Sequence, residues 1–459
     1  MVDPSGPRDR ARSRPRSRSV ICLLLAVVSI VVAMPLDGAS FARRRPRRIS
    51  GSRHIGPGVR FIWERDRRGP WRIKIISVDL DARPQMKIAI AHDKLNGRRE
   101  TTSSMARRYH AIAAINGDFG WTRPVHAIAT RGELLQWARG WWTPYNFAVG
   151  NEDARAVFGD FDYDAWTRSG RAPRRPLHSV NAGRPERRQH SLFTPEGSTL
   201  EKPPGRTCSA RLRPLDRPRF VAGGAAMVTG HSVERVLCRR SPLWRRGGSV
   251  LSTERWGPGA GEISALDAGA RVAVGWSTGR RGVAQSMGGF PLLVRRGRIA
   301  RRYMDGRRPF FGRHPRTGVG YDADRNRLLL ATVDGRRPGY SVGMKLRAFA
   351  RVFKRRGCEW ALNLDGGGST TSVVRGRVRN RPSDGSERPV SSAVLVVPRR
   401  RAVQAPEPSA PSAEPSQAAA GLDALASDAG STGGLVAVVR DLGVPLLPQL
   451  RAAARHAAR

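Results

Sequence analysis

The chain has 459 residues, and its 82 Lys and Arg against 37 Asp and Glu give a formal net charge of +45 at pH 7. Such a charge suggests nucleic-acid binding. However, the basic residues are scattered, often as isolated Arg-Arg pairs, and no zinc-ligand set, aromatic stacking motif or recognition-helix pattern accompanies them. We therefore expect no nucleic-acid partner, but a general attraction to anionic envelope polymers.

Residues 1–42 are predicted to be a signal peptide. An Arg-rich polar start precedes an almost unbroken apolar run from Val20 to Met34, and the small residues Ser40 and Ala42 fit cleavage after Ala42. The alternative is an uncleaved N-terminal anchor, because a strongly basic segment follows, although the apolar run is shorter than the roughly 20 residues of a membrane span. Both interpretations predict a secreted or extracytoplasmic protein.

Composition divides the rest of the chain into three regions. Residues 43–59 are basic and are predicted to be a linker. Residues 60–397 show no linker-like break and are predicted to form one domain. Residues 398–459 are rich in Ala and Pro. Because such a sequence buries too little apolar surface to offset the entropy of ordering, we expect this tail to be disordered.

Within residues 60–397, β-branched and alternating patterns predict short strands. In chain order we expect them at residues 71–80, 86–91, 111–115, 147–149, 271–276, 291–294, 327–333, 359–365 and 372–374. Residues 155–219 are polar and Pro-rich and predict no clear element.

Two helices are also predicted. A short one spans residues 101–109, with Thr102 or Ser103 as its N-cap. A longer one begins at Val342 or Gly343 and ends at Gly357. Its apolar residues recur at spacings of three and four and predict a buried stripe of Leu346, Phe349, Ala350 and Phe353. Because strands outnumber helices without regular alternation, we predict an α+β fold, with a mixed, strand-rich sheet core and a few packed helices in a single domain.

Four cysteines limit the disulfide chemistry. Cys22 leaves with the signal peptide, so an oxidising compartment allows one internal bridge among the other three. Cys208 and Cys238 both flank predicted strands and are the expected pair. Cys358, between a helix end and a strand, is then expected to be a buried, inert thiol.

The segment at the end of the strand predicted at residues 359–365 carries the strongest chemical signal. Because side chains alternate along a strand, Asn363 and Asp365 share one face at its end. The following residues, Gly366-Gly367-Gly368-Ser369, bring bare backbone amides close to whatever lies there, which suits anions or sugar hydroxyls. The alternative is a Gly-rich turn that the Asn and Asp merely brace. No Lys follows the glycines, so the segment is not a P-loop.

Several blocks in a fixed order resemble the phosphodiester glycosidase family. They are Ala114–Phe119, Ser286–Val294, Pro315–Gly320, Asp334–Arg336, Gly339–Met344 and Ala361–Thr370. The resemblance covers residues 60–397, with departures at Gly120 and in residues 155–219. It implies a hydrolase that cleaves a sugar from a glycosyl phosphodiester.

The resemblance also implies roles for individual residues. In this chemistry the leaving phosphate must be held while an oxocarbenium-like carbon forms. Arg316 is expected to bind the phosphate bidentately, with Thr317 adding a hydroxyl donor. Asp365 is expected to be the general base or nucleophile, with Asp118 or Asp334 as a second carboxylate.

Asn116 and Asn363 would orient sugar hydroxyls or phosphate oxygens, the alternative being that they brace strand ends. Arg336 would contact the substrate or pair with Asp334. No cofactor is predicted. A divalent cation at Asp365 or Asp118 is left open, because no ligand spacing demands one.

The predicted function is therefore that of an exported hydrolase acting on a phosphorylated glycan of the envelope or extracellular matrix. The alternative is a non-catalytic basic module that binds anionic envelope polysaccharide, which the high net charge favours. The sequence carries no indication of the oligomeric state.

Overall fold

The computed structural model describes residues 48–95, 97–140, 145–149, 154–182, 190–197, 207–221, 223–238, 248–257 and 259–398. The predicted signal peptide and, beyond Pro398, the predicted tail lie outside these residues. Contacts gather the chain up to Val397 into one compact unit, but its buried apolar residues form several separate clusters. The single domain therefore stays a prediction. No helix in the described part of the chain is both long and apolar enough to cross a membrane.

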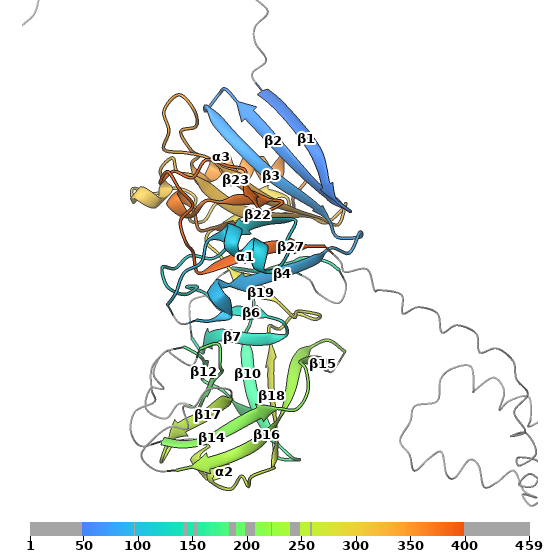
Figure 1. Ribbon diagram of the computed structural model, residues 1–459, viewed down its shortest axis with the longest axis vertical. Coiled ribbons are helices and arrows are strands. Elements are labelled where there is room, and N and C mark those ends of the chain that lie inside the picture. The colour runs from blue at the N-terminus through green and yellow to red at the C-terminus, as the bar shows by residue number, and fades with distance from the viewer. Residues whose placement is uncertain are drawn as a thin grey trace, which may run out of the picture. The chain divides into compact units, whose positions relative to one another are not determined.

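The first of three sheets has eight strands (Figure 1). In spatial order they are β1 (Arg48–Gly56), β2 (Val59–Asp66), β3 (Trp71–Asp79), β23 (Arg327–Val333), β22 (Arg316–Asp322), β24 (Trp360–Leu364), β20 (Leu292–Arg295) and β21 (Arg298–Ile299). The strands predicted at residues 71–80 and 327–333 are confirmed as the neighbours β3 and β23. Ile76 faces Leu330 across this pair, and both are fully buried.

The predicted basic linker at residues 43–59 is wrong where the structure describes it. Residues 48–56 form strand β1, which pairs with β2 along its whole length. β1 lies at the edge of the sheet and exposes most of its side chains, so its polar sequence lacks the apolar alternation by which a strand is recognised. Its basic charge is partly neutralised, because Arg48 forms an ion pair with the buried Glu64.

The second sheet has five strands. In spatial order they are β26 (Arg377–Val378), β25 (Ser372–Val374), β5 (Ala113–Asn116), β27 (Ser392–Val397) and β4 (Gln85–Ile90). Helix α1 (Thr102–Arg108) packs on it through the buried Met105 and Ala106. The N-cap lies earlier than predicted, because it is the Thr101 hydroxyl that accepts a hydrogen bond from the N–H of Ser104 at 3.2 Å.

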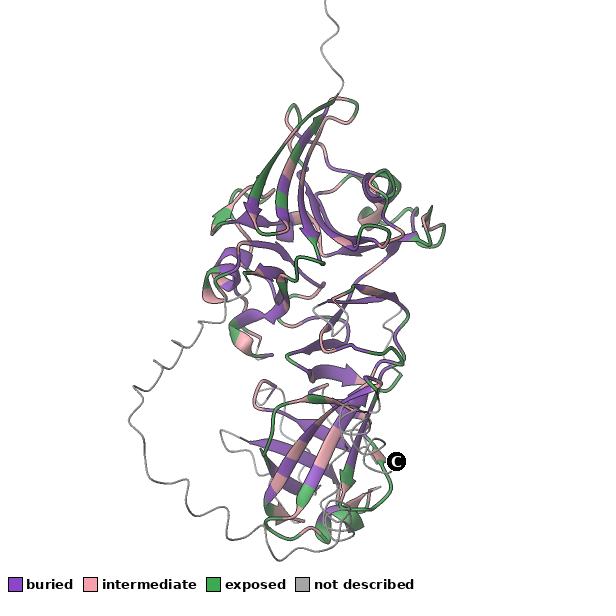
Figure 2. Cartoon of the chain, turned by 90° about the vertical axis from the view of Figure 1, so that its right-hand side faces the viewer, coloured by how far each residue is buried: buried purple, intermediate pink, exposed green. Residues whose placement is uncertain are grey.

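The third sheet has fourteen strands. In spatial order they are β11 (Arg175–Pro176), β10 (Asp164–Ser169), β18 (Arg271–Ser277), β16 (Ala226–Leu237), β14 (Thr207–Pro214), β17 (Ser249–Glu254), β13 (Ser191–Phe193), β12 (Ser179–Val180), β7 (Glu133–Ala138), β6 (Ile128–Thr130), β19 (Ser286–Gly288), β8 (Asn146–Ala148) and β9 (Val157–Gly159), with β15 (Arg219–Val221) beside β16. Buried and less buried residues alternate along β16, whose Thr229 and His231 share the buried face (Figure 2). Short helix α2 (Ala260–Ser264) packs against β14 and β16.

The predicted strand-rich core is confirmed, but the predicted α+β balance is wrong. The protein is mostly β, and the described residues contain only three α-helices. The polar stretch at residues 155–219 contains several strands, such as β10 and β14. Arg and Pro residues in this stretch obscure the apolar pattern by which a strand is recognised in a sequence. Strand pairs are antiparallel in the described chain apart from β12 with β13, which is parallel.

Helix α3 (Leu346–Lys354) covers the first sheet. The predicted stripe of Leu346, Phe349, Ala350 and Phe353 is fully buried, as expected. A Cβ atom on Gly320 of β22 would lie 2.4 Å from the ring of Phe353, so glycine there lets the helix approach the sheet closely. The helix begins later than predicted, because Gly343 has a left-handed φ of +84°.

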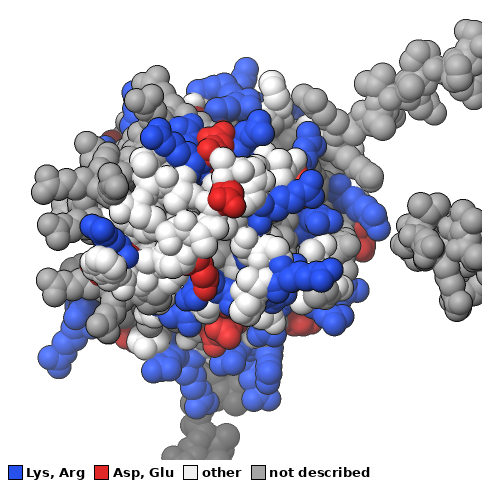
Figure 3. Space-filling model, turned by 90° about the horizontal axis from the view of Figure 1, so that it is seen from below, with Lys and Arg blue, Asp and Glu red and all other residues white. Residues whose placement is uncertain are grey.

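Charge on the surface is dispersed. On the face seen in Figure 3, Lys and Arg side chains stand mostly around the edge, with uncharged residues between them. This face therefore carries no continuous basic stripe of the kind that would follow a nucleic-acid backbone. The absence of a nucleic-acid partner stays a prediction.

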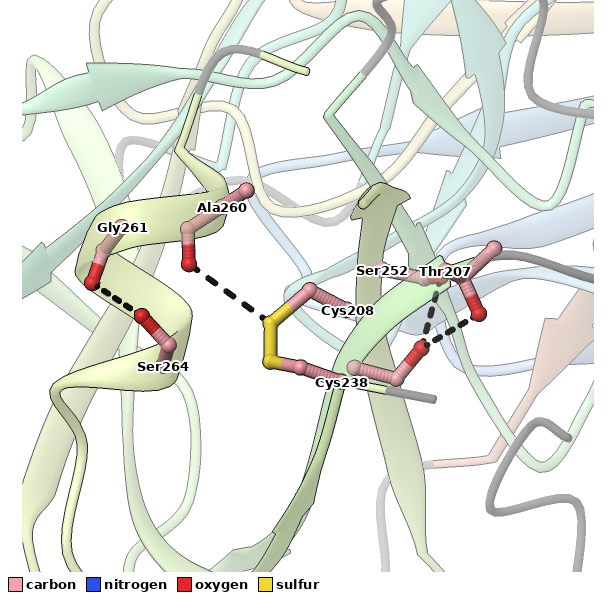
Figure 4. Close-up of a disulfide and its surroundings, with 8 residues drawn as sticks. Thr207, Cys208, Cys238, Ser252, Ala260, Gly261 and Ser264 are labelled. Carbon is pink, nitrogen blue, oxygen red and sulfur yellow. Dashed lines mark hydrogen bonds between the residues drawn. A yellow bond between two sulfur atoms is a disulfide. The ribbon is translucent and has the colours of Figure 1, made fainter. Parts of the chain in front are cut away.

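The expected disulfide is confirmed. Cys208 in β14 is bonded to Cys238, directly after β16, and Sγ of Cys208 lies 3.5 Å from the carbonyl oxygen of Ala260 in α2 (Figure 4). Cys358 is free and buried, and burial raises the pKa of its thiol to about 12, which makes it unreactive as expected.

Reduction of the disulfide should lower the free energy of unfolding by about 3 kcal/mol, because the bridge closes a loop of intermediate length in the unfolded chain. The two cysteines are 30 positions apart. Chemical denaturation with and without a thiol reductant measures the change, and a Cys208→Ser/Cys238→Ser variant should be insensitive to the reductant. Unchanged stability after full reduction, verified by thiol titration, would contradict the prediction.

Candidate active site

The segments that follow β5 and β24 meet where the first and second sheets adjoin. β5 leads into Gly117 and Asp118, and β24 ends directly before Asp365. The N–H of Asp365 donates to the carbonyl oxygen of Gly117 at 3.1 Å. Nδ2 of Asn116 donates to the carbonyl oxygen of Asp365 at 2.7 Å, across 249 positions of the sequence. The fold thus brings the two predicted carboxylates, Asp118 and Asp365, to one place.

Asp365 is the partly exposed carboxylate of this site. Burial raises its pKa to about 6, and the negative charge of Asp118 adds to the rise. Hydrogen bonds from the Ser369 hydroxyl and the Gly366 N–H, and the charge of Arg388, act in the opposite direction. A carboxylate that changes charge this close to neutral pH is suited to proton transfer or nucleophilic attack.

Asp118 forms a buried pair with His126. Its Oδ1 accepts hydrogen bonds from Nδ1 of His126 and from the N–H of Phe119, both at 2.7 Å, and its Oδ2 accepts one from the N–H of His126 at 2.8 Å. Burial lowers the pKa of His126, but the charge of Asp118 and its hydrogen bond raise that pKa more. Both carboxylate oxygens of Asp118 therefore accept hydrogen bonds from the protein, and the group is suited to a fixed electrostatic role.

Two guanidinium groups lie against the glycine segment after β24. A Cβ atom on Gly367, whose φ is +59°, would lie 2.9 Å from Nη2 of Arg336, and one on Gly368 would lie 2.1 Å from Nη2 of Arg388. Both guanidinium groups therefore reach the backbone of the glycine segment, and the positive φ of Gly367 additionally favours glycine there. Arg388 pairs with Asp384, with Nε 2.9 Å from Oδ2. Arg336 is exposed and has no ion pair with any residue the structure describes.

Arg316, which was predicted to bind the phosphate, has its guanidinium group held by backbone carbonyl oxygens. Its side chain is only 2% exposed. Nε donates to the carbonyl oxygen of Met344 at 3.0 Å, and Nη2 donates to those of Phe310 and Gly312, both at 2.8 Å. Burial lowers the pKa of Arg316 to about 10, and the nearby charge of Arg336 contributes. Arg316 therefore holds the loop around residues 310–312 in place.

Asn116 and Thr317 brace the junction, and their substrate contacts stay a prediction. Both are fully buried. The Thr317 hydroxyl donates to Oδ1 of Asn116 at 2.8 Å, and the N–H of Thr371 donates to the same oxygen at 3.0 Å. Together with its bond to the Asp365 carbonyl, these contacts make Asn116 the residue that joins three segments.

Asn363 and Asp334 likewise form hydrogen bonds within the protein, and their predicted roles toward a substrate stay predictions. Each is 1% exposed. Nδ2 of Asn363 donates to the carbonyl oxygen of Phe290 at 2.8 Å. The Asp334 carboxylate accepts hydrogen bonds from the N–H of Arg381 at 3.0 Å and from the Tyr340 hydroxyl at 3.1 Å. Both side chains are thus largely enclosed, and Oδ1 of Asn363 has no hydrogen-bond partner among the described residues.

His126 and Arg388 are site residues that the sequence did not reveal. His126 follows the Asp118 block closely, but nothing in its neighbourhood marks it as a partner for a carboxylate. Arg388 lies in a loop without a motif, well beyond the glycine segment. Among the described residues no group of three or more His, Cys, Asp or Glu is placed to hold a metal ion.

Aromatic rings lie beside the carboxylate pair. The ring of Phe119, next to Asp118, lies 6.2 Å from that of Phe310 between centroids. The Phe310 ring lies 6.1 Å from that of Phe290, which in turn lies 5.1 Å from that of Tyr303. Such rings provide a surface on which a sugar can stack.

Comparison with known proteins finds a family match for part of the chain. Residues 224–397 match the phosphodiester glycosidase family. The predicted resemblance is thereby confirmed for the part of the chain that carries Asp365, the glycine segment, Arg336 and Arg388. The match does not extend to Asp118 and His126, which come to the site only through the fold.

Individual relatives are distant or short. An uncharacterised SPβ prophage-derived protein of Bacillus subtilis, YomE, is 38% identical over 84 residues, which is 18% of this chain and 13% of that protein. A Synechocystis protein of known structure is 18% identical with a TM-score of 0.55, over 74% of this chain and 62% of its own. A Burkholderia pseudomallei protein is 20% identical with a TM-score of 0.52, over 72% and 74%. The two structures share the fold.

Proposed function

We propose that this chain is an exported phosphodiester glycosidase that removes a sugar from a glycosyl phosphodiester in an envelope or extracellular glycan. The observation that carries the proposal is the placement of Asp365, partly open, beside Asp118 and a glycine segment flanked by two guanidinium groups. The family match over residues 224–397 supports the same chemistry.

Each part of the reaction is assigned to particular residues. The bond from the anomeric carbon to the phosphate oxygen breaks, a phosphate monoester leaves, and the oxygen of water ends on the sugar. Arg336 and Arg388 would hold the phosphate, because guanidinium groups match its oxygens. Asp365 would act as general base or nucleophile, while Asp118, held by His126, stabilises positive charge at the anomeric carbon.

The activity should depend on the protonation of Asp365. Because the reacting form is the carboxylate and its pKa is about 6, kcat/KM should rise about tenfold per pH unit up to that pH and then level off. Initial rates between pH 4 and 8 measure this profile. A rate that instead falls above pH 6 would identify Asp365 as a general acid.

Replacing Arg336 by Ala should lower kcat/KM about 10- to 100-fold, mainly through KM, because a charged hydrogen bond to the phosphate is lost. Arg351→Ala is the matched control, since Arg351 is exposed on α3 and also lacks an ion pair among the described residues. Equal effects of the two substitutions would assign the loss to general charge and not to a phosphate contact.

The proposal is tested with synthetic glycosyl 1-phosphate methyl esters incubated in ¹⁸O-labelled water. The expected products are free sugar carrying the label and unlabelled methyl phosphate. Label in the phosphate would show cleavage of the P–O bond and contradict the proposal. Saturable binding without product, weakening steeply with salt, would favour the non-catalytic basic module instead.

A further inference from the structure

A cavity of about 160 Å³ lies within the third sheet, away from the Asp365 site. Its lining comes from eight strands, β7, β10, β12, β13, β14, β16, β17 and β18. Nε1 of Trp276 in β18 donates to the carbonyl oxygen of Gly132, next to β7, at 2.8 Å and so joins strands that are far apart in the sheet order. No residue of the candidate active site lines this cavity.

The size and the walls of the cavity restrict its ligand. Apolar side chains form much of the lining, among them Leu134, Leu177, Val180 and Leu192. A cavity of about 150 Å³ with such walls accommodates one benzene-sized ring. The cavity therefore suits a single six-membered ring.

Polar side chains with unused hydrogen-bonding atoms also line the cavity. Thr229, His231 and Ser249 are each only 7% exposed. The hydroxyls of Thr229 and Ser249 have no hydrogen bond to any described residue. His231 uses only Nδ1, which lies 3.1 Å from the carbonyl oxygen of Thr229. Because Nδ1 must donate there, Nε2 of the neutral imidazole is an acceptor, and burial lowers the His231 pKa and so favours this neutral form. These atoms remain accessible from the cavity, so they are free to hydrogen-bond a molecule bound there.

Two carboxylates complete the lining. Glu133 and Glu196 form no ion pair within the described chain, although Lys and Arg outnumber Asp and Glu by 82 to 37. The charge of Arg131 lowers the pKa of Glu133, but Arg131 forms its ion pair with Asp93. Burial and the negative charge of Glu196 both raise the pKa of Glu133. A cation bound between the two carboxylates would relieve their mutual repulsion.

We propose that this cavity is a binding site for a small organic cation, a protonated amine carried on a single six-membered ring. The ring lies against the apolar wall formed by Leu134, Leu177, Val180 and Leu192. The ammonium group donates to the carboxylates of Glu133 and Glu196 and to Nε2 of His231. The site is independent of the proposed hydrolase activity.

Titration calorimetry of the full-length protein with benzylammonium at pH 7 tests the proposal. Because the chain's net charge of +45 repels cations in general, saturable one-site binding reports a local site. We expect benzylammonium to bind at least about tenfold more tightly than benzyl alcohol, and benzoate not to bind. Absence of saturable binding, or equal binding of the alcohol and the cation, would overturn the proposal.

Variants locate the site. Glu133→Gln/Glu196→Gln should weaken benzylammonium binding about tenfold or more, because the paired charge is lost. Val180→Phe should abolish binding by filling the cavity, with the thermal midpoint checked to show that it folds. Asp267→Asn, an exposed acid outside the lining, should bind as wild type does. If Glu133→Gln/Glu196→Gln binds benzylammonium as tightly as wild type does, the assignment of the site is refuted, whatever the result for Val180→Phe.

Discussion

Replacing Asp365 by Asn should reduce kcat/KM for a glycosyl phosphodiester by about 10³-fold, the usual scale for loss of a reacting acid or base. The amide keeps the shape of the side chain but can neither accept a proton nor attack the anomeric carbon. Steady-state rates at pH 7 measure the change. Asp324→Asn, at an exposed position on the loop between β22 and β23, should leave the rate unaltered.

The loss must be separated from unfolding. Burial disfavours the charged form of Asp365, as its pKa of about 6 indicates, so the neutral Asn should not destabilise the fold at pH 7. Because the folded pKa is raised from 3.8 to about 6, the stability cost of the charge grows between these two pH values and is fully present at pH 7. The thermal midpoint of the variant should therefore be no lower than that of wild type. A fully active Asp365→Asn variant would remove this carboxylate from the mechanism.

Arg316→Met should lower the free energy of unfolding by about 4 kcal/mol, one of the largest effects expected in this chain. The methionine fills part of the space but leaves the carbonyl oxygens of Met344, Phe310 and Gly312 without their donor. Chemical denaturation measures the change, with the exposed Arg351→Met as control. A stable Arg316→Met enzyme with a raised KM would restore the phosphate contact that the sequence had suggested.

The sequence predicted those elements in which local pattern and tertiary environment agree. β3 and β23 are central strands of their sheet, so their residues either alternate between apolar and polar or are continuously apolar. Both strands lie where they were predicted. β1 was missed because an edge strand needs no apolar alternation. In the site, alternation correctly paired Asn363 with Asp365, but it could not distinguish a side chain that faces a substrate from one held by the carbonyl of Phe290.

Arginine was the hardest residue type to interpret. A guanidinium satisfied by carbonyl groups and one exposed to solvent look the same in a sequence, so Arg316 and Arg336 could be assigned only once their surroundings were known. Arg388 and His126 reach the site from loops without motifs, and only long-range contacts place them.

The threefold attachment of Asn116 bears on how far the chain can be shortened. A truncated protein that began at residue 224 would retain the whole family match but lack β5, and with it the amide that fixes the carbonyl of Asp365, the N–H of Thr371 and the hydroxyl of Thr317. The stretch that matches the family thus lacks contacts that hold the Asp365 segment, and efforts to shorten the protein should retain the N-terminal strands.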